Sequence, residues 1–129
     1  MIVEMTPTVQ YVSLGNTTEL KCSVHYRGYA WSSINIAQQN KSGSFLLLNV
    51  YSNGNVESIT SRINASVTKD DDYINVTVSF DASPGSGVCE LNQTYSCDIQ
   101  LIDSSIGTIA ANSTLILEGK YTLHCLNLK

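Results

Sequence analysis

The chain has few charged side chains, no cluster of basic residues and no long apolar segment. Only 14% of its 129 residues are charged, and 11 acidic side chains outnumber 7 basic ones, which gives a net charge of −4. Nucleic-acid affinity comes largely from Lys and Arg on phosphates, so this composition argues against such a partner. The longest apolar run, Phe45 to Leu48, is far shorter than the ~18 residues of a membrane span. We therefore expect neither nucleic-acid binding nor membrane insertion by this segment.

Sequence patterns of catalysis and metal binding are missing as well. The two histidines, His25 and His124, are far apart, and there is no nucleophile elbow, phosphate-binding loop or CxxC pair. The run Asp70 to Asp72 stands beside Lys69 and lacks the further oxygen donors that a calcium loop supplies at fixed spacing. We interpret this run as a solvated turn, and we predict a protein that is not an enzyme and uses no cofactor or metal.

The length corresponds to a single domain whose polarity comes from uncharged side chains. Ser, Thr and Asn number 17, 11 and 11. The N-terminus lacks the cationic start and apolar centre of a signal peptide, so we interpret Met1 as an added start residue of an excised or mature domain. We expect residues 1–7 to be a lead-in, residues 8–118 to form the domain, and residues 119–129 to be a tail that leads to a further domain of the parent protein.

Cysteines and sequons indicate the compartment. Four widely spaced cysteines favour two disulfides and an oxidising environment, while four buried free thiols in a cytosolic protein are the alternative. Six of the eleven asparagines lie in Asn-x-Ser/Thr sequons, well above what the Ser and Thr content gives by chance. Together these features predict a secreted or cell-surface glycoprotein. The cysteines are Cys22, Cys89, Cys97 and Cys125, and the sequon asparagines are Asn16, Asn40, Asn64, Asn75, Asn92 and Asn112.

Alternation of apolar and polar residues is the dominant pattern and predicts β-strands. Asn53-Gly54 is typical of a tight hairpin turn between two strands. Short strands with turn signals between them, and no helical period, indicate an all-β protein with a two-sheet sandwich. The predicted strands are 20–24, 34–37, 45–51, 63–67, 73–80, 95–101 and 108–118.

Several of these segments resemble the variable-type domains of the immunoglobulin superfamily. The resemblance spans Thr8 to Glu118, and the 75 positions between Cys22 and Cys97 suit a variable-like domain with the extra C′ hairpin. It implies strands B, D, F and G at the four matching motifs, with the tyrosine of strand F two residues before the second cysteine, as in a tyrosine corner. The motifs are Gly15-x-x-x-x-Leu20-x-Cys22, Arg62-Ile63-x-x-Ser66, Tyr95-x-Cys97 and Gly107-Thr108.

The sequence departs from the variable-type pattern at three places. Ile36 occupies the place of the strand C tryptophan, while Trp31 comes earlier, in the predicted B–C loop. Leu91 stands where an aspartate is expected, so Arg62 lacks its usual partner, and the segment 81–94 is long and carries an extra cysteine. With these departures the chain looks most like the immunoglobulin domains of molluscan fibrinogen-related lectins, which implies an innate-immune lectin as the parent protein.

The resemblance also implies the disulfide pairing. Cys22 and Cys97 would join the two sheets. Cys89, in the E–F loop, and Cys125, after strand G, would then lie at the same end of the sandwich, so we expect a second disulfide that fixes the tail. A bond between two chains through Cys125 is the alternative.

The predicted B–C loop is the candidate binding site. Tyr26, Arg27, Tyr29 and Trp31 have the composition that is enriched in recognition loops. Inward packing of one of these rings, in place of the missing strand C tryptophan, is an equally good interpretation for Trp31. The C′ turn and the F–G turn, residues 102–106, are expected at the same end.

These observations predict a non-catalytic extracellular recognition module that binds a protein or glycoprotein, with innate-immune recognition as its role. A cell-adhesion domain that pairs through the face of strands G, F and C is one alternative, and a viral decoy glycoprotein is another. Asn64, Asn75 and Asn112 are expected to point outward, and a glycan on Asn112 would obstruct pairing through that face. The other three sequons are expected at the end opposite the candidate loops, which leaves the loop tip open to a partner.

Overall fold

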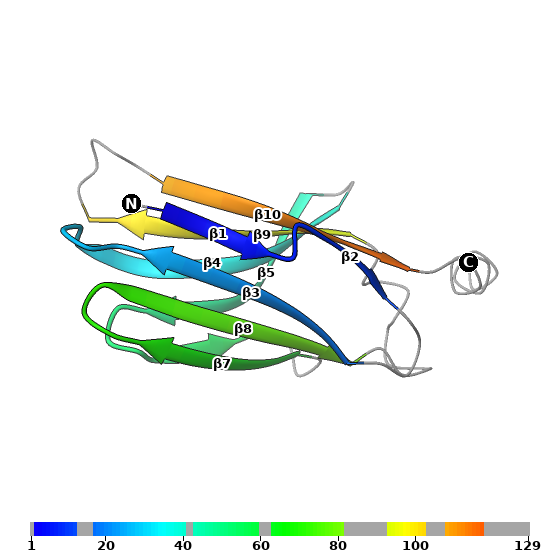
Figure 1. The fold of residues 1–129 in the computed structure, drawn as a ribbon, viewed down its shortest axis with the longest axis horizontal. Coiled ribbons are helices and arrows are strands. Elements are labelled where there is room, and N and C mark those ends of the chain that lie inside the picture. The colour runs from blue at the N-terminus through cyan, green and yellow to red at the C-terminus, as the bar shows by residue number, and fades with distance from the viewer. Residues whose placement is uncertain are drawn as a thin grey trace.

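The structure, a computed structural model, describes residues 2–12, 17–40, 43–59, 63–81, 93–102 and 108–117. These residues form ten strands and no helix, and the strands build two sheets that pack face to face (Figure 1). The predicted all-β two-sheet sandwich is therefore confirmed. None of the described segments is a helix long and apolar enough to cross a membrane.

The first sheet has four antiparallel strands in the order β1-β3-β8-β7. Its inner face is set by simple alternation, since Leu20, Cys22 and Val24 on β3 are buried while the residues between them are exposed or half-buried. The outer face consequently carries Ser, Thr, Asn and Lys side chains. The strands are β1 (Ile2–Thr6), β3 (Thr17–His25), β7 (Ile63–Lys69) and β8 (Tyr73–Asp81).

The second sheet has six strands in the order β2-β10-β9-β4-β5-β6. Its pairs are antiparallel except for β2 and β10, which run parallel. The hairpin of β5 and β6 is the predicted C′ extension, and a bulge at Ile36/Ala37 shifts the register of β4 against β5. The strands are β2 (Val9–Val12), β4 (Trp31–Asn40), β5 (Gly43–Tyr51), β6 (Val56–Ser58), β9 (Thr94–Leu101) and β10 (Thr108–Leu117).

The core lies between the sheets around one disulfide. Cys22 of β3 and Cys97 of β9 are bonded, with their Cα atoms 6.3 Å apart, as predicted. Ile36 lies opposite Cys97 in the β4–β9 register and is buried, so isoleucine fills the place of the strand C tryptophan. Tyr95 is completely buried, and its ring packs 5.1 Å from that of Phe80, centroid to centroid. Aromatic and aliphatic side chains thus enclose the disulfide from both sheets.

The first residues of the chain belong to the sandwich, which corrects the predicted boundary. We expected residues 1–7 to precede the domain, but Ile2–Thr6 forms β1 and pairs with β3 along its whole length. Met5 lies opposite Cys22 in this register and is 3% exposed, so it is part of the core. After Pro7 the chain crosses to the second sheet, where it continues as β2. Removal of this segment would therefore uncover the core.

Some of the predictions concern residues outside the described part of the chain. They include the second disulfide, the tail 119–129 and most of the predicted F–G turn. The individual residues are Cys89, Cys125, Asn16, Asn92, Arg62 and Leu91.

Candidate functional site

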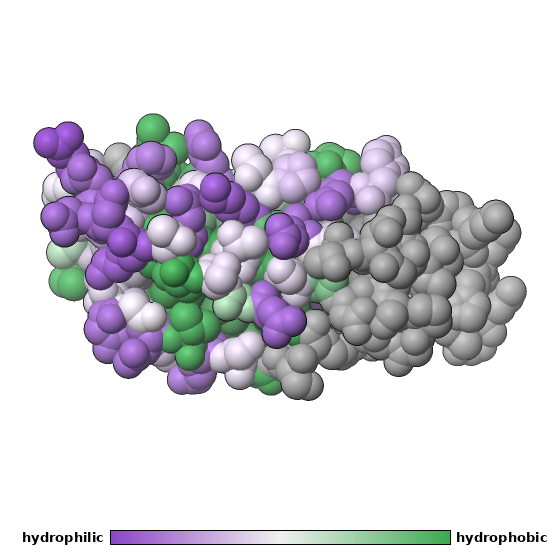
Figure 2. Space-filling view, turned by 60° about the horizontal axis from the view of Figure 1, so that its bottom comes forward, coloured by the Kyte–Doolittle hydropathy of each residue, from purple (hydrophilic) through white to green (hydrophobic). Residues whose placement is uncertain are grey.

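Three turns and one strand end meet at one end of the sandwich, on the left in Figure 1, and we call this end the loop tip. It consists of residues 26–30 between β3 and β4, residues 52–55 between β5 and β6, residues 70–72 between β7 and β8, and Ile102 after β9. The described residues at this end are mainly hydrophilic (Figure 2). The loop tip is where the sequence analysis placed the candidate binding residues.

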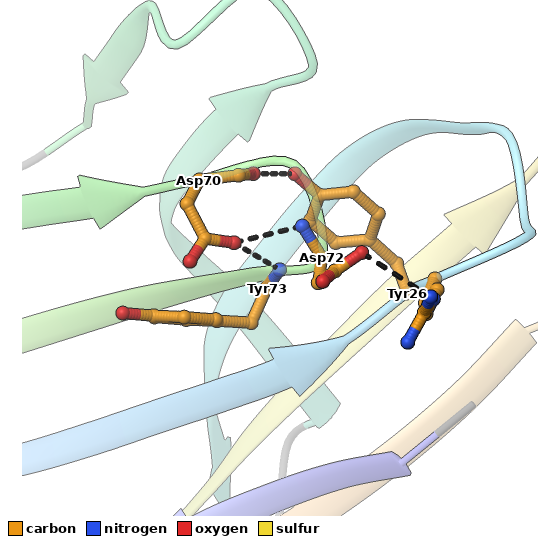
Figure 3. Close-up of polar contacts among 5 residues, drawn as sticks. Tyr26, Asp70, Asp72 and Tyr73 are labelled. Atoms are coloured by element: carbon orange, nitrogen blue, oxygen red, sulfur yellow. Dashed lines mark hydrogen bonds and ion pairs between the residues drawn. The ribbon is translucent and has the colours of Figure 1, made fainter.

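Tyr26 does not lie on the surface of the loop tip, which corrects its expected exposure. Only 8% of the residue is exposed, because its ring packs under the loop. The Tyr26 hydroxyl donates a hydrogen bond to the backbone carbonyl of Asp70 (Figure 3). The Tyr26 N–H donates to the carbonyl of Asp72 at 2.9 Å. Tyr26 therefore joins the 26–30 loop to the 70–72 turn instead of facing a partner.

Trp31 is also buried, so the inward interpretation of this residue is confirmed. It is the first residue of β4, not a loop residue, and 5% of it is exposed. Its ring centroid lies 5.5 Å from that of Tyr26, with the planes inclined by 52°. This is a favourable tilted arrangement for two aromatic rings. The two rings close the core at this end of the molecule, and Trp31 lies five residues before Ile36 on β4.

Tyr29 and Arg27 are the predicted residues that remain at the surface. Gly28, with φ of +82°, allows the tight turn in which the Tyr29 N–H donates to the Tyr26 carbonyl at 2.8 Å. Tyr29 is 39% exposed, and the Arg27 side chain is 85% exposed. Arg27 Nε lies 3.7 Å from Asp72 Oδ1, an exposed pair of small energetic weight, so its guanidinium stays available to a partner.

Ile102 is an exposed apolar residue beside the 26–30 loop that sequence reasoning did not single out. Its N–H donates to the Ala30 carbonyl at 3.0 Å, and 65% of the residue is exposed. The available signal was an isoleucine directly after a strand, in a segment expected to turn. Together Tyr29 and Ile102 give the loop tip an apolar part next to the charged Arg27.

The acidic run forms the predicted solvated turn between β7 and β8. Asp70 Oδ1 accepts from the backbone N–H groups of Asp72 at 2.7 Å and Tyr73 at 3.0 Å, so this carboxylate organises the turn itself (Figure 3). All three aspartates are exposed. In the part of the chain that the structure describes, no group of His, Cys, Asp and Glu side chains is arranged to hold a metal ion.

The predicted hairpin turn between β5 and β6 is confirmed. Gly54 has φ of +91°, and its N–H donates to the Tyr51 carbonyl at 2.8 Å. Lys69 Nζ donates to the Ser52 carbonyl at 2.7 Å and ties this turn to the end of β7. The three turns of the loop tip are thus joined by hydrogen bonds from Tyr26 and Lys69.

The outer face of the second sheet is the alternative binding surface. Its centre is polar, with Asn35 Nδ2 donating to Asp98 Oδ1 at 3.0 Å and Gln39 Nε2 donating to Ser96 Oγ at 3.1 Å. Leu46, on β5, is 37% exposed at the side of this face. The central polar groups of this face therefore already bond to one another.

The sequons in the described strands differ in how their asparagines are held. Asn64 is exposed on the outer face of β7, as predicted. Asn75 lies on the same face of the neighbouring β8, but it is half-buried, and its Oδ1 accepts a 2.6 Å hydrogen bond from Ser23 Oγ. Asn40 is the last residue of β4, and Asn112 lies on β10 opposite Ser96.

Burial and charge both act on the phenol of Tyr26. Burial raises the pKa of Tyr26 above its ordinary value of 10.0, and the carboxylates of Asp70, Asp71 and Asp72 raise it further. The folded state holds the phenol proton of Tyr26 more tightly than the unfolded state does. The protonated phenol therefore stabilises the fold below pH 10.0, and this contribution is lost as the pH rises through the pKa of Tyr26 in the folded state.

Tyr26→Phe is expected to lower the free energy of unfolding by about 1 kcal/mol at neutral pH, because the Asp70 carbonyl loses its donor. The difference in unfolding free energy between the variant and the wild type should become smaller above about pH 10, because only the wild type loses stability when its phenol ionises. Denaturant unfolding of both proteins over this pH range measures the effect, with Tyr29→Phe as the control at an exposed ring. A difference that widens at high pH would contradict this assignment.

Comparison with solved structures finds proteins with a similar fold. The chain is similar to a murine CRIg structure, with a TM-score of 0.66 and 13% identity over 92% of this chain and 98% of that one. It is also similar to a swine CD8aa homodimer, with a TM-score of 0.65 and 17% identity over 92% of this chain and all of the other. Searches of protein-family models and of curated proteins give no match. Both structures are immunoglobulin-like variable domains, and the likeness shows that this chain has that fold. It gives no support to the narrower resemblance to molluscan lectins.

Proposed function

We propose that this chain is a non-catalytic extracellular domain that recognises a protein or glycoprotein partner through its loop tip. The variable-type immunoglobulin fold, the disulfide between the sheets and the six sequons support an extracellular location. Recognition in the innate-immune setting, as a module of a larger lectin, is the narrower form of the proposal, and it rests on the sequence resemblance alone.

The observation that carries the proposal is the exposed set of Arg27, Tyr29 and Ile102 at one end of the sandwich. Their exposed fractions are 85% for the Arg27 side chain, 39% for Tyr29 and 65% for Ile102. Tyr and Arg are enriched among the residues that dominate binding energy, and an apolar neighbour adds area that a partner can bury. The set therefore combines a guanidinium, an aromatic ring and an aliphatic side chain.

The base of the loop tip is held in place by its buried residues. Tyr26 bonds to the 70–72 turn, Trp31 packs against Tyr26, and Lys69 bonds to the 52–55 turn. A loop that is already ordered loses less conformational entropy when a partner binds. Inward packing of Tyr26 and Trp31 thus supports recognition indirectly, by presenting Arg27 and Tyr29 on a fixed frame.

Pairing through the outer face of the second sheet is the competing function. The polar centre of that face is already hydrogen-bonded internally, and the Asn112 sequon lies on β10 beside it. A glycan at this position would obstruct flat contact between two sheets. These features favour the loop tip over the sheet face as the binding surface.

The test begins with a partner selected from a displayed library of extracellular proteins, using the glycosylated chain in multivalent form. The triple variant Arg27→Ala/Tyr29→Ala/Ile102→Ser should weaken its affinity at least about tenfold, or about 1.4 kcal/mol. The matched control, Leu46→Glu/Gln100→Glu, changes the outer face of the second sheet and should leave the affinity unchanged. Unchanged affinity of the triple variant, with loss in the control, would show that the sheet face binds.

A further inference from the structure

β7 is an edge strand of seven residues, and among the described residues its outer edge is open along the whole strand. The outermost strands are β1 and β7 in the first sheet and β2 and β6 in the second. An unpaired strand edge is a template for pairing with another chain, and proteins usually protect it with short strands, charges, proline or bulges. β2 has four residues, β6 has three, and β1 carries Glu4 near its middle.

β7 has none of these protections along most of its length. Its seven residues pair with β8 without a register shift, and they contain no proline. Lys69 is its only charged residue, stands at its last position and bonds to the Ser52 carbonyl. In the described part of the chain nothing pairs with the other side of β7. A second copy could therefore add its own β7 there in regular antiparallel register.

Apolar side chains adjoin this edge. Ala65 and Val67 point from β7 toward the core but remain half-buried. On the second sheet, Val56 of β6 is 43% exposed and Ile59, just after β6, is 56% exposed. Figure 2, which brings the β7 side of the molecule forward, shows hydrophobic residues between the polar ones on this side. Edge-to-edge pairing of two copies would bury part of this surface and would be favoured by it.

We propose that Asn64 carries an N-linked glycan that covers the β7 edge and prevents two copies of this chain from pairing through it. Asn64 is the second residue of β7, is exposed, and begins the sequon Asn64-Ala65-Ser66. The Asn64 side chain leaves the outer face of the edge strand, and an added strand would lie only about 4.8 Å to its side, so a bulky glycan there would obstruct that strand. The proposal rests on the extracellular location in the proposed function.

The covalent step uses the ordinary chemistry of the secretory pathway. The Asn64 Nδ2 atom forms a bond to the anomeric carbon of the first N-acetylglucosamine of a lipid-pyrophosphate-linked oligosaccharide. The bond from that carbon to the pyrophosphate breaks, the lipid pyrophosphate leaves with the electron pair, and Nδ2 gives up one proton. No oxidation or reduction takes place, and the exposed Asn64 amide presents its nitrogen to solvent.

Asn75 provides the natural comparison on the same sheet. It lies on β8, which has β3 on one side and β7 on the other, so a glycan at Asn75 would not stand on an edge strand. Its side chain is half-buried, and its Oδ1 already accepts a hydrogen bond from Ser23. Loss of the Asn75 sequon should therefore leave self-association unaffected.

The experiment compares the full chain, secreted from a eukaryotic cell line, with three variants of single residues. Ser66→Ala removes the Asn64 sequon, Thr77→Ala removes the Asn75 sequon but keeps the Asn75–Ser23 hydrogen bond, and Ser66→Lys removes the sequon while placing a charge on β7. Peptide mapping after enzymatic deglycosylation in heavy-oxygen water identifies the occupied asparagines. Sedimentation velocity over a concentration series measures self-association, and circular dichroism confirms that each variant is folded.

We expect Asn64 to be occupied and the wild type and Thr77→Ala to be monomeric. Ser66→Ala should form dimers and larger species at concentrations where the wild type does not, and Ser66→Lys should be monomeric although it lacks the glycan. An unmodified Asn64, or a folded Ser66→Ala that stays monomeric, would overturn the proposal. Equal self-association of Ser66→Ala and Ser66→Lys would also overturn it, because the β7 edge would then not be the contact. None of these outcomes depends on partner binding at the loop tip, which is measured separately.

Discussion

Replacing Cys22 and Cys97 together by alanine is expected to lower the free energy of unfolding by about 4 kcal/mol. The disulfide joins residues 75 positions apart, so its loss frees a long loop in the unfolded chain. Both cysteines are completely buried, so the change also removes packing between the sheets. Guanidinium unfolding of the wild type and the variant, under non-reducing conditions, measures the difference.

The matched control for this prediction is Cys89→Ser/Cys125→Ser, which leaves the bond between the sheets intact. We expect this control to lose less stability than Cys22→Ala/Cys97→Ala. Non-reducing peptide mapping of the wild type checks the pairing itself, and we predict a Cys89–Cys125 peptide beside the Cys22–Cys97 peptide. A Cys22–Cys89 or Cys97–Cys125 peptide would contradict the register of the sandwich.

Trp31→Ala is expected to cost about 3–5 kcal/mol of unfolding free energy, the usual range for removing a large buried ring. Trp31 is 5% exposed and packs against Tyr26, so the change leaves a cavity beneath the loop tip. Trp31 is the only tryptophan in the chain, and its fluorescence should therefore be blue-shifted in the folded protein and move to the red on unfolding.

Tyr29→Ala is the control for the tryptophan, because this ring lies two residues before Trp31 but is 39% exposed. We expect its effect to stay within about 0.5 kcal/mol, as for most surface substitutions. Chemical denaturation of both variants gives the comparison. Similar small losses in Trp31→Ala and Tyr29→Ala would mean that Trp31 is not a core residue.

The strands were predictable from the sequence because a sheet with one buried face forces apolar residues into a period of two. Leu20, Cys22 and Val24 show this period, and all three are buried in β3. The Asn53-Gly54 turn was predictable for a local reason as well, since Gly54 has the positive φ that the turn needs. Both signals depend on residues that are close together in the chain.

The sequence did not reveal features that depend on residues far apart in the chain. Tyr26 is buried because its hydroxyl meets the Asp70 carbonyl, 44 positions later, and no local pattern reports that contact. β1 was missed because its five residues are a weak signal alone, and only pairing with β3 shows that Met5 belongs to the core. In both cases tertiary contacts decided the outcome.

Burial of Tyr26 changes how the candidate site is understood. Of the four residues predicted to bind, Arg27 and Tyr29 stand at the surface, while Tyr26 and Trp31 form the support beneath them. Substitutions at the two buried positions should therefore act through stability, whereas those at the two exposed positions should act on affinity. This separation makes the proposed site testable without confusing loss of binding with loss of fold.

Backbone amide hydrogen exchange of the domain, measured with and without the selected partner, tests the proposed recognition surface most directly. We predict that the partner slows exchange in residues 26–30, 52–55 and 70–72, the described turns of the loop tip. Exchange in residues 44–49 of β5 and 94–100 of β9, which line the outer face of the second sheet, should not change. Slowed exchange confined to those two strands, with the loop tip unaffected, would contradict binding at the loop tip and assign it to the sheet face.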